Sequence, residues 1–390
     1  MRSQAFICKK LIGAAIVLLL SSLSNMPHAQ DVESQVQHIK VYHETGRYGG
    51  WPANNGIWIW GNEILTGFSK AHYKDMGLKH NIDRDKTEIH ALARSKNGGE
   101  SWEIEDPGIR GNLVPEALFG IQRTDVPYIK PVHLNEAMDF THPNFTFTAR
   151  MGKKDSSSFW YSYDKGMHWK GPFLLPHLGT SGMQARTDYI IDGAKEAMLF
   201  LTVPKSDGKE GRVMCVATKD GGISWNFKSW IGTEPEGFSI MPASVRLSKT
   251  KLLVTTRDKK GDDTFISTYF SNDNGKTWSY QGKAVADTGI GNPPAMVKMK
   301  DGRICLIYGY RSDPDGTKTS DIRAKISSDE GKTWSRDYVL RKDGSGRDVG
   351  YPRVVQRPDG KIVAIYYFMD KATGSERYIA ASIWTPPLKN

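Results

Sequence analysis

Five copies of one eight-residue pattern constrain the fold more than any other feature of this sequence. Each copy, called a box below, reads Ser/Thr, any residue, Asp/Asn, any residue, Gly, any residue, Ser/Thr/His and Trp. The boxes begin at Ser95, Ser162, Thr218, Ser271 and Ser327, so their starts are 67, 56, 53 and 56 residues apart. This near-constant interval indicates that the chain repeats one supersecondary unit.

The residue types in a box are those of a tight turn between two strands. An Asp or Asn side chain accepts hydrogen bonds from the backbone N–H groups that follow it. Glycine adopts the positive φ that such a turn requires. The Trp begins the next strand, where its ring can pack back over the turn. Each box is therefore expected to hold two adjacent strands together.

Between the boxes the chain reads as short strands, for example at residues 57–60, 251–256, 302–308 and 361–367. About four strands in each unit of roughly 55 residues predict an all-β fold, a β-propeller with six blades. The inner strands are expected to begin near Pro52, His142, Arg186, Met241, Pro293 and Tyr351.

The ends of the chain and the first interval bear on how the ring closes. The sixth blade has no box, and its third strand is expected at residues 378–384, close to the end of the sequence. We expect residues 37–42 to supply the missing fourth strand and close the ring. Because the first interval is long, a seventh blade between Glu103 and Asp139 is an alternative interpretation.

The first 29 residues have the pattern of a signal peptide. Arg2, Lys9 and Lys10 precede an apolar run at residues 11–20, which is too short to span a bilayer. Ala29 provides a small residue for cleavage, so residues 30–390 are expected to form one exported domain, periplasmic or secreted. No later apolar run reaches transmembrane length.

Net charge and cysteine content limit the kinds of binding partner and metal site that are expected. Without the signal peptide the chain has 50 basic and 43 acidic residues, a net charge of +7, which favours acidic polymers as partners. The basic residues are scattered, so a nucleic-acid partner is not expected. Cys215 and Cys305 lie in apolar strand-like runs and are expected to be free core thiols. No zinc or calcium spacing is present in the sequence, so no metal or cofactor is expected.

With the signal peptide and the predicted six blades, the boxes resemble the Asp-boxes, or bacterial neuraminidase repeats, of the sialidase superfamily, over residues 51–384. The superfamily contains sialidases, other exo-glycosidases, glycan lyases and non-catalytic proteins. In sialidases three arginines clamp the substrate carboxylate. A tyrosine assisted by a glutamate attacks the sugar, and an aspartate is the acid/base.

Two positions of this sequence match the sialidase pattern. Arg257 follows the strand-like run 252–256, as the second clamp arginine does, and Tyr351 opens the last blade, as the nucleophile does. Three other positions depart from it. Gly50 replaces the first clamp arginine, and Met241 replaces the glutamate. Lys318 and Thr319 stand where the third arginine is expected.

Further candidates lie in the first blade. Trp51 and Asn54 belong to a dense polar and aromatic stretch, where Trp51 would stack on a sugar face and Asn54 would bond hydroxyl groups. The polar loop that follows contains Asp83 and Asp85, which the resemblance implies as acid/base candidates. His72 lies where propeller lyases that resemble this family place a catalytic histidine, and histidine titrates near neutrality.

The remaining candidates open other blades. Arg186 and Arg353 would replace the missing clamp arginines, or else pair with nearby aspartates, Asp188 and Asp348 respectively. His142 is a candidate for the mouth of the second blade.

Three functions follow from these residues. The first is an exo-acting glycoside hydrolase for terminal acidic or uronate-linked sugars, and the second is a glycan lyase. The third is a carbohydrate-binding propeller without catalysis.

Overall fold

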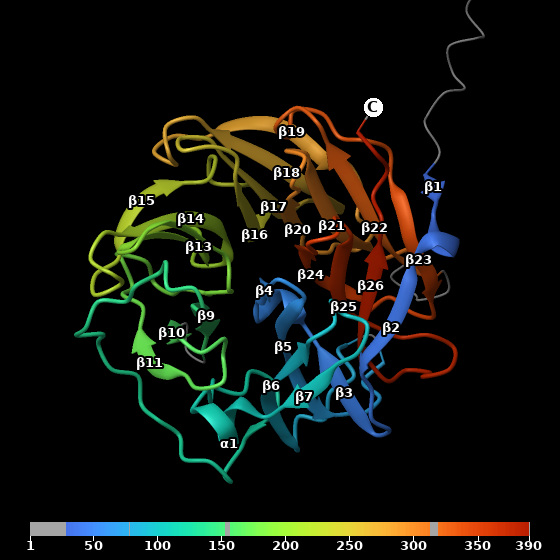
Figure 1. Cartoon of the computed structure of the whole chain (residues 1–390), viewed down its shortest axis with the longest axis horizontal. Coiled ribbons are helices and arrows are strands. Elements are labelled where there is room, and N and C mark those ends of the chain that lie inside the picture. The colour runs from blue at the N-terminus through green and yellow to red at the C-terminus, as the bar shows by residue number, and fades with distance from the viewer. Residues whose placement is uncertain (1–28, 78, 153–156, 313–318, 390) are drawn as a thin grey trace, which may run out of the picture.

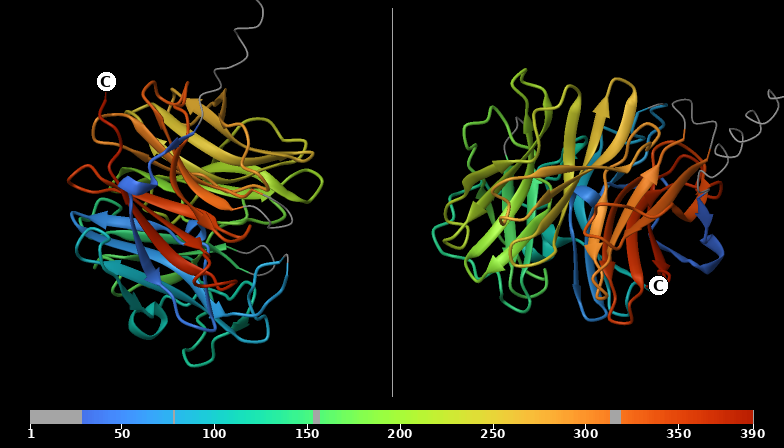
Figure 2. Two further views of the ribbon diagram at one scale, coloured as in Figure 1. Left: turned by 90° about the vertical axis from the view of Figure 1, so that its right-hand side faces the viewer. Right: turned by 90° about the horizontal axis from the view of Figure 1, so that it is seen from above.

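Six β-sheets arranged around one axis form the protein (Figure 1). The structure is a computed structural model and describes residues 29–77, 79–152, 157–312 and 319–389. The predicted signal peptide, apart from Ala29, lies outside the described residues. Side views show the strands running between the two ends of the ring (Figure 2). The prediction of a six-bladed β-propeller is confirmed.

The first three blades extend to β15, which follows the third box. Blade 1 contains β3 (Arg47–Gly50), β4 (Ile57–Trp60), β5 (Glu63–His72), β6 (Thr87–Ser95), β7 (Glu103–Glu105) and the short β8 (Ile121–Gln122). Blade 2 has three strands, β9 (Thr146–Met151), β10 (Ser157–Ser162) and β11 (Lys170–Leu174). Blade 3 contains β12 (Tyr189–Gly193), β13 (Glu196–Pro204), β14 (Glu210–Thr218) and β15 (Asn226–Trp230).

The last three blades complete the ring. Blade 4 contains β16 (Phe238–Arg246), β17 (Leu252–Lys260), β18 (Asp263–Ser271) and β19 (Ser279–Val285). Blade 5 contains β20 (Ala295–Lys298), β21 (Ile304–Tyr310), β22 (Ser320–Ser327) and β23 (Tyr338–Gly344). Blade 6 contains β24 (Gly350–Gln356), β25 (Ile362–Phe368) and β26 (Tyr378–Trp384).

The ring closes between the two ends of the chain. Strand β2 (Gln37–Tyr42) pairs antiparallel with β26 and is the fourth strand of blade 6, as predicted. Before it, β1 (Gln30–Asp31) pairs in parallel with β23, and the 3-10 helix η1 (Glu33–Gln35) follows. The alternative of a seventh blade is wrong. Residues 103–139 form β7, β8 and the five-residue helix α1 (Pro107–Gly111), with no further sheet.

The boxes form the turns that the pattern predicts. In the second box the Gly166 N–H donates to Ser162 Oγ (3.0 Å), and the His168 N–H donates to Asp164 Oδ1 (2.9 Å). The same two bonds occur in all five boxes, at 2.8–3.0 Å. Gly166 has a φ of 78°, which only glycine adopts without strain.

Side chains between neighbouring blades form the core. Separate clusters of buried apolar residues fill each of the six interfaces around the ring. Both described cysteines are free and buried there, as predicted. In the part of the chain that the structure describes, no helix is long and apolar enough to cross a membrane.

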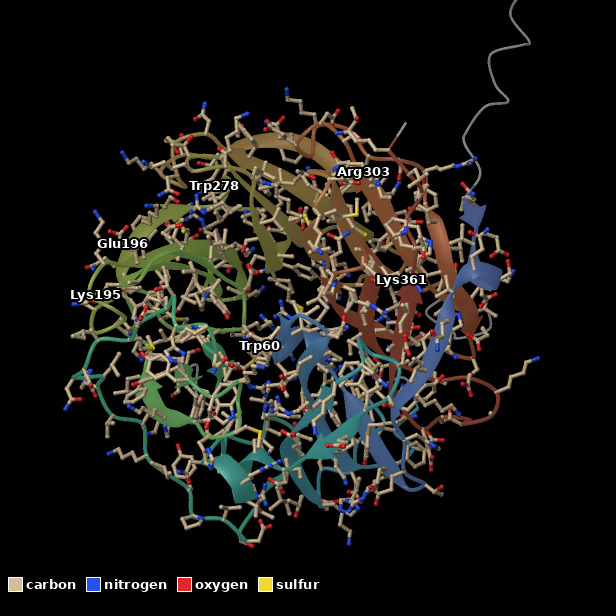
Figure 3. The ribbon with its side chains drawn as sticks, viewed as in Figure 1. Trp60, Lys195, Glu196, Trp278, Arg303 and Lys361 are labelled. Atoms are coloured by element: carbon tan, nitrogen blue, oxygen red, sulfur yellow. The ribbon has the colours of Figure 1, made fainter. Side chains whose placement is uncertain are left out.

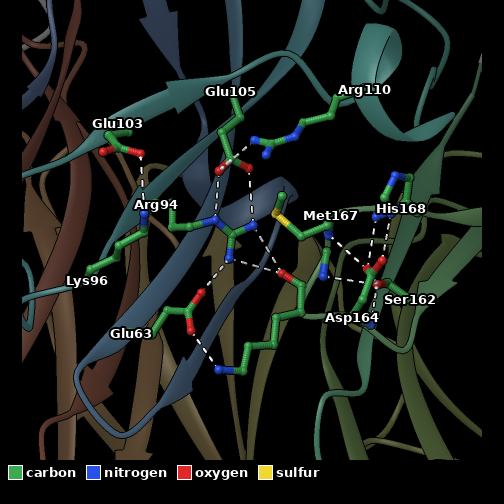
Figure 4. A network of polar contacts seen from close by, with 12 residues as sticks. Glu63, Arg94, Lys96, Glu103, Glu105, Arg110, Ser162, Asp164, Met167 and His168 are labelled. Atoms are coloured by element: carbon green, nitrogen blue, oxygen red, sulfur yellow. Dashed lines mark hydrogen bonds and ion pairs between the residues drawn. The ribbon is translucent and has the colours of Figure 1, made fainter.

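Ion pairs add to the contact between blades 1 and 2 beside the second box (Figure 4). The buried Arg94 guanidinium donates to Glu105 (2.7 Å), to Glu63 (2.9 Å) and to the Lys165 carbonyl. The Lys165 ammonium also donates to Glu63 (2.7 Å). Because a buried charge is tolerated only when it is paired, this network fixes how the two blades meet.

Candidate functional site

Strand register shows that the boxes lie at one end of the ring and the candidate site at the other. Leu252, at the start of β17, pairs with Ser271 of the fourth box, whereas Lys260, at its end, pairs with Asp263. The turns between the first and second strands of the blades reach the box end, where Figure 3 labels Lys195 and Glu196. Arg257 therefore lies towards the opposite end, called the open end below.

A cavity of about 410 Å³ opens at this end and brings together residues from four blades, 1, 4, 5 and 6. We call it the cationic pocket, and it is lined by Lys79, His80, Arg84, Arg257, Ile290, Arg311, Arg347, Asp348 and Tyr351. Five of these nine residues are Lys or Arg, and Asp348 is the one carboxylate among them. Low-dielectric walls with charge of one sign concentrate ions of the opposite sign, so the pocket suits an anionic ligand.

Tyr351 is held by a bulge at the start of β24. The pairing of β24 with β25 shifts register between Gly350 and Arg353, and Tyr351 has a φ of 50°. The buried Asn292 fixes this conformation, because its Oδ1 accepts from the Tyr351 N–H (3.0 Å) and its Nδ2 donates to the Val349 carbonyl (2.8 Å). Bulges re-aim side chains at active sites, and a non-glycine residue at positive φ persists only where its surroundings impose it.

Two arginines flank Tyr351. Arg257 Nη1 donates to Tyr351 Oη at 3.2 Å, and the Arg311 guanidinium lies 5.3 Å from the centre of the Tyr351 ring. Arg257 comes from blade 4 and Arg311 from blade 5, directly after β21. The structure thus joins two predicted residues, Arg257 and Tyr351, and adds a second arginine beside them.

His80 and Asp348 form a hydrogen-bonded pair in the same pocket. His80 Nδ1 donates to Asp348 Oδ2 at 3.0 Å. Burial alone would raise the pKa of Asp348, but the hydrogen bond from His80 and the charges of Arg377 and Arg311 hold it well below its usual range. Asp348 is therefore an anion that fixes the tautomer of His80. Among the described residues, His80 Nε2 has no hydrogen-bond partner.

Trp51 supports this histidine instead of offering a surface to a sugar. Its side chain is buried, with 2% exposed, and its ring contacts His80 edge-on at 5.0 Å and Phe119 at 4.7 Å. The Trp51 ring therefore packs on His80 and Phe119 and is not accessible for stacking on a sugar, contrary to what the sequence suggested. Its signal in the sequence, an aromatic residue before an inner strand, is equally that of a core residue.

Asn54, Arg186 and Arg353 fill the axis of the ring. The 3-10 helix η2 (Pro52–Asn54) lies between the blades, and its polar groups are covered by arginines. Arg186 Nε donates to Asn54 Oδ1 (3.1 Å), Arg150 Nη1 donates to the Asn54 carbonyl (3.2 Å), and Arg353 Nη2 donates to the Ala53 carbonyl. None of the three predicted residues lines the cationic pocket. Asp348 also pairs with His80, Arg311 and Arg377, whereas the sequence suggested Arg353 as its partner.

The predicted acid/base residues lie at the open end but outside the lining of the pocket. Lys74 lies 3.6 Å from Asp83 and 3.3 Å from Asp85, and the Asp85 side chain is 83% exposed. His72 contacts Arg47, and burial together with the charge of Arg47 lowers its pKa, which favours the neutral ring. Their catalytic roles stay predictions.

His142 lies next to the second box. Its ring contacts Tyr163 at 4.7 Å, and the neighbouring Asn144 carbonyl accepts from the N–H of Lys165 in the box turn. Thr146, at the start of β9, pairs with Ser162 of the second box, so His142 lies at the box end and not at the mouth of the blade. The expectation placed it at the wrong end of the ring.

Comparisons with known proteins agree with this architecture. A family model described as a BNR repeat-like domain matches residues 120–364. The chain belongs to the BNR repeat-like domain family. None of the curated proteins matches its sequence.

Solved structures resemble this BNR repeat-like chain in fold. A protein of unknown function from Dyadobacter fermentans is 20% identical with a TM-score of 0.66, covering 90% of this chain and 98% of its own. The NanB sialidase of Streptococcus pneumoniae is 11% identical with a TM-score of 0.58, covering 88% and 70%. The α-L-arabinanase of Penicillium chrysogenum is 12% identical with a TM-score of 0.54, covering 89% and 97%. These likenesses show a shared propeller.

Of the nine residues that line the pocket of this BNR repeat-like domain, the sequence singles out two as site residues, Arg257 and Tyr351. Among the seven others, His80, Arg311 and Asp348 matter most for the chemistry. For Arg311 a signal exists, because it directly follows the run at residues 304–310 of blade 5, much as Arg257 follows the run at residues 252–256 of blade 4. The expected position near Lys318 and Thr319 lies farther along the chain, and Lys318 is outside the described residues. His80 and Asp348 lie in loops without periodicity, where only the fold brings them together.

Proposed function

We propose that this protein is an exported, exo-acting glycoside hydrolase that removes a negatively charged terminal sugar from a glycan. The cationic pocket carries the proposal, because it combines an anion-attracting wall with Tyr351 and with the His80–Asp348 pair. Arginines hold carboxylates through charge-assisted, bidentate bonds, and Arg257 and Arg311 are suited to that role.

In the proposed mechanism His80 is the general base and Tyr351 is the general acid. Asp348 accepts a hydrogen bond from His80 Nδ1 and is paired with Arg311 and Arg377, so Nε2 of the neutral His80 ring is the atom assigned to accept a proton. In the proposed step His80 Nε2 takes a proton from water, whose oxygen bonds to the anomeric carbon. The glycosidic C–O bond breaks, and Tyr351 Oη gives its proton to the departing oxygen. Arg257, bonded to Tyr351 Oη, stabilises the negative charge left there.

A lyase on uronate sugars is a second candidate that the same groups favour. The arginines would neutralise the sugar carboxylate, and His80 would take a proton from the neighbouring ring carbon instead of from water. The electron pair of that C–H bond would form a C=C bond as the C–O bond breaks, with Tyr351 again protonating the departing oxygen. The two reactions share every residue and differ in their product.

The deciding experiment incubates the protein with sialylated oligosaccharides, rhamnose-capped glycans and uronate polymers. New reducing ends without ultraviolet absorbance indicate hydrolysis, and absorbance from an unsaturated uronate indicates the lyase. Tyr351→Phe and His80→Ala should each lower kcat at least 10²-fold, as expected for loss of general acid or base catalysis. Tyr128→Phe, whose tyrosine is 52% exposed and outside the pocket, serves as control. No product from any glycan would refute the proposal.

Export rests on the predicted signal peptide. Amino-terminal sequencing of the protein recovered from its native host should begin near Gln30. Recovery of an intact N-terminus inside the cell would contradict export.

A further inference from the structure

A second cavity runs along blade 4 from the open end towards the fourth box and takes no part in the chemistry above. It has a volume of about 290 Å³ and is lined by residues 233–239 and by parts of β17, β18 and β19. We propose that this cavity, called the aromatic groove, binds internal sugar units of the glycan whose terminal unit occupies the cationic pocket. The inference rests on the proposed function and extends it, because it makes the substrate an oligosaccharide or polymer.

Aromatic rings give the groove its affinity for sugars. Phe238, Phe265, Tyr269 and Tyr280 all line it. Tyr280 is 56% exposed, and its ring lies 5.6 Å from that of Tyr269 at an angle of 59°. The apolar C–H face of a sugar ring packs on an exposed aromatic face, and rigid aromatic side chains lose little conformational entropy on binding.

The polar lining of the groove suits neutral sugar units. Its carboxylates are Glu234, Glu236 and Asp258, and its cations are Lys259 and Lys260. Lys260 and Glu236 already pair at 2.7 Å. This near balance differs from the cationic pocket, where positive charge dominates. A few placed donors and acceptors on an aromatic wall are typical of sites that orient hydroxyl groups.

The two cavities are separated by one strand edge. Arg257 and Asp258 are consecutive in β17, and successive side chains of a strand point to opposite faces. Accordingly Arg257 lines the cationic pocket and Asp258 lines the aromatic groove. Phe238 lies between them, because it lines the groove and its ring centre is 5.6 Å from the Arg257 guanidinium. A glycan leaving the cationic pocket across Phe238 reaches the groove directly.

The test compares long and short substrates in the variant Tyr280→Ala. Because the ring is largely exposed, its removal should leave folding unchanged. For the polymer that the wild type cleaves, kcat/KM should fall about tenfold through a higher KM, equivalent to about 1.4 kcal/mol. For the nitrophenyl glycoside of the same terminal sugar it should not change. Tyr128→Ala, which removes an equally exposed tyrosine between blades 1 and 2, should leave both values unchanged.

Two results overturn the inference: an unchanged kcat/KM on the polymer, or an equal fall on both substrates. If the wild type cleaves nothing, retardation in native gels containing the same three classes of glycan replaces the kinetic comparison. Retardation that Tyr280→Ala weakens and Tyr128→Ala preserves supports the groove even though the proposed enzyme activity has failed. Equal migration of all three proteins overturns it.

Discussion

Replacing Asp348 with Asn tests the centre of the proposed site. Asp348 is buried, and its carboxylate contacts His80 at 3.0 Å, Arg377 at 3.4 Å and Arg311 at 3.5 Å. The substitution keeps the shape of the side chain and removes its charge. It leaves two buried guanidinium groups without their shared counter-ion, and it leaves His80 without the acceptor that fixes its tautomer.

The expected loss of stability follows from that burial. Removing one partner of a buried ion pair costs about 3–5 kcal/mol. Unfolding entropy is about 2.1 cal/mol/K per residue, so about 360 residues give roughly 0.75 kcal/mol/K. A loss of about 4 kcal/mol therefore lowers Tm by about 5 °C. Loss of a positioned general base lowers kcat by about 10²-fold or more.

Differential scanning calorimetry and kinetics on the cleaved glycan measure the two effects. Glu330→Gln is the control, because Glu330 pairs with Lys251 at 2.8 Å and both side chains are 40% exposed. An exposed pair contributes about 0–1 kcal/mol, so the control should melt within about 1 °C of the wild type. If Asp348→Asn melts as the wild type does, the buried charge does not stabilise the site. If it also keeps full kcat, His80 is not the base.

Three further outcomes are expected. Arg257→Lys should lower kcat/KM about 10–100-fold, because a bond to a charged group contributes about 1.5–3 kcal/mol; an unchanged value would remove Arg257 from substrate binding. Asp85→Asn should change activity less than twofold, because the side chain is largely exposed; a large loss would return the acid/base role to this loop. Burial raises the pKa of Asp188 from 3.8 to about 6, so its stabilising effect is present below pH 4 and lost as the pH rises through 6. Urea unfolding measures the change in the free energy of unfolding between pH 4 and pH 7, and Asp188→Asn should make this change smaller by about 2–3 kcal/mol. The same change in the variant as in the wild type would contradict the assignment.

The sequence predicts the architecture well because the boxes are local. A box needs only eight consecutive residues to form its turn, so its position marks a blade without any knowledge of the rest of the chain. The strand at residues 37–42 was predictable for a related reason, since blade 6 lacked a fourth strand at its own end. Tyr351 and Arg257 were found because they occupy defined places relative to strands.

The rest of the site depends on how the axis is filled. Arg186 and Arg353 open inner strands, which suggests a place at the mouth, but helix η2 occupies the middle of the ring and takes their hydrogen bonds. No local sequence pattern predicts that η2 occupies the middle of the ring. His80, in contrast, lies in the pocket but was not predicted. It belongs to an irregular loop and is held by Trp51 and Asp348, which are distant from it in sequence.

The closure by β2 has a consequence for when the protein can work. The His80–Asp348 bond joins the first blade to the last, across the seam that the pairing of β2 with β26 holds shut. Until β26 has been made, β2 has no partner in this sheet and the seam stays open. The histidine then has no carboxylate beside it, so competence for proton transfer arrives only once β26 is in place and the ring is closed.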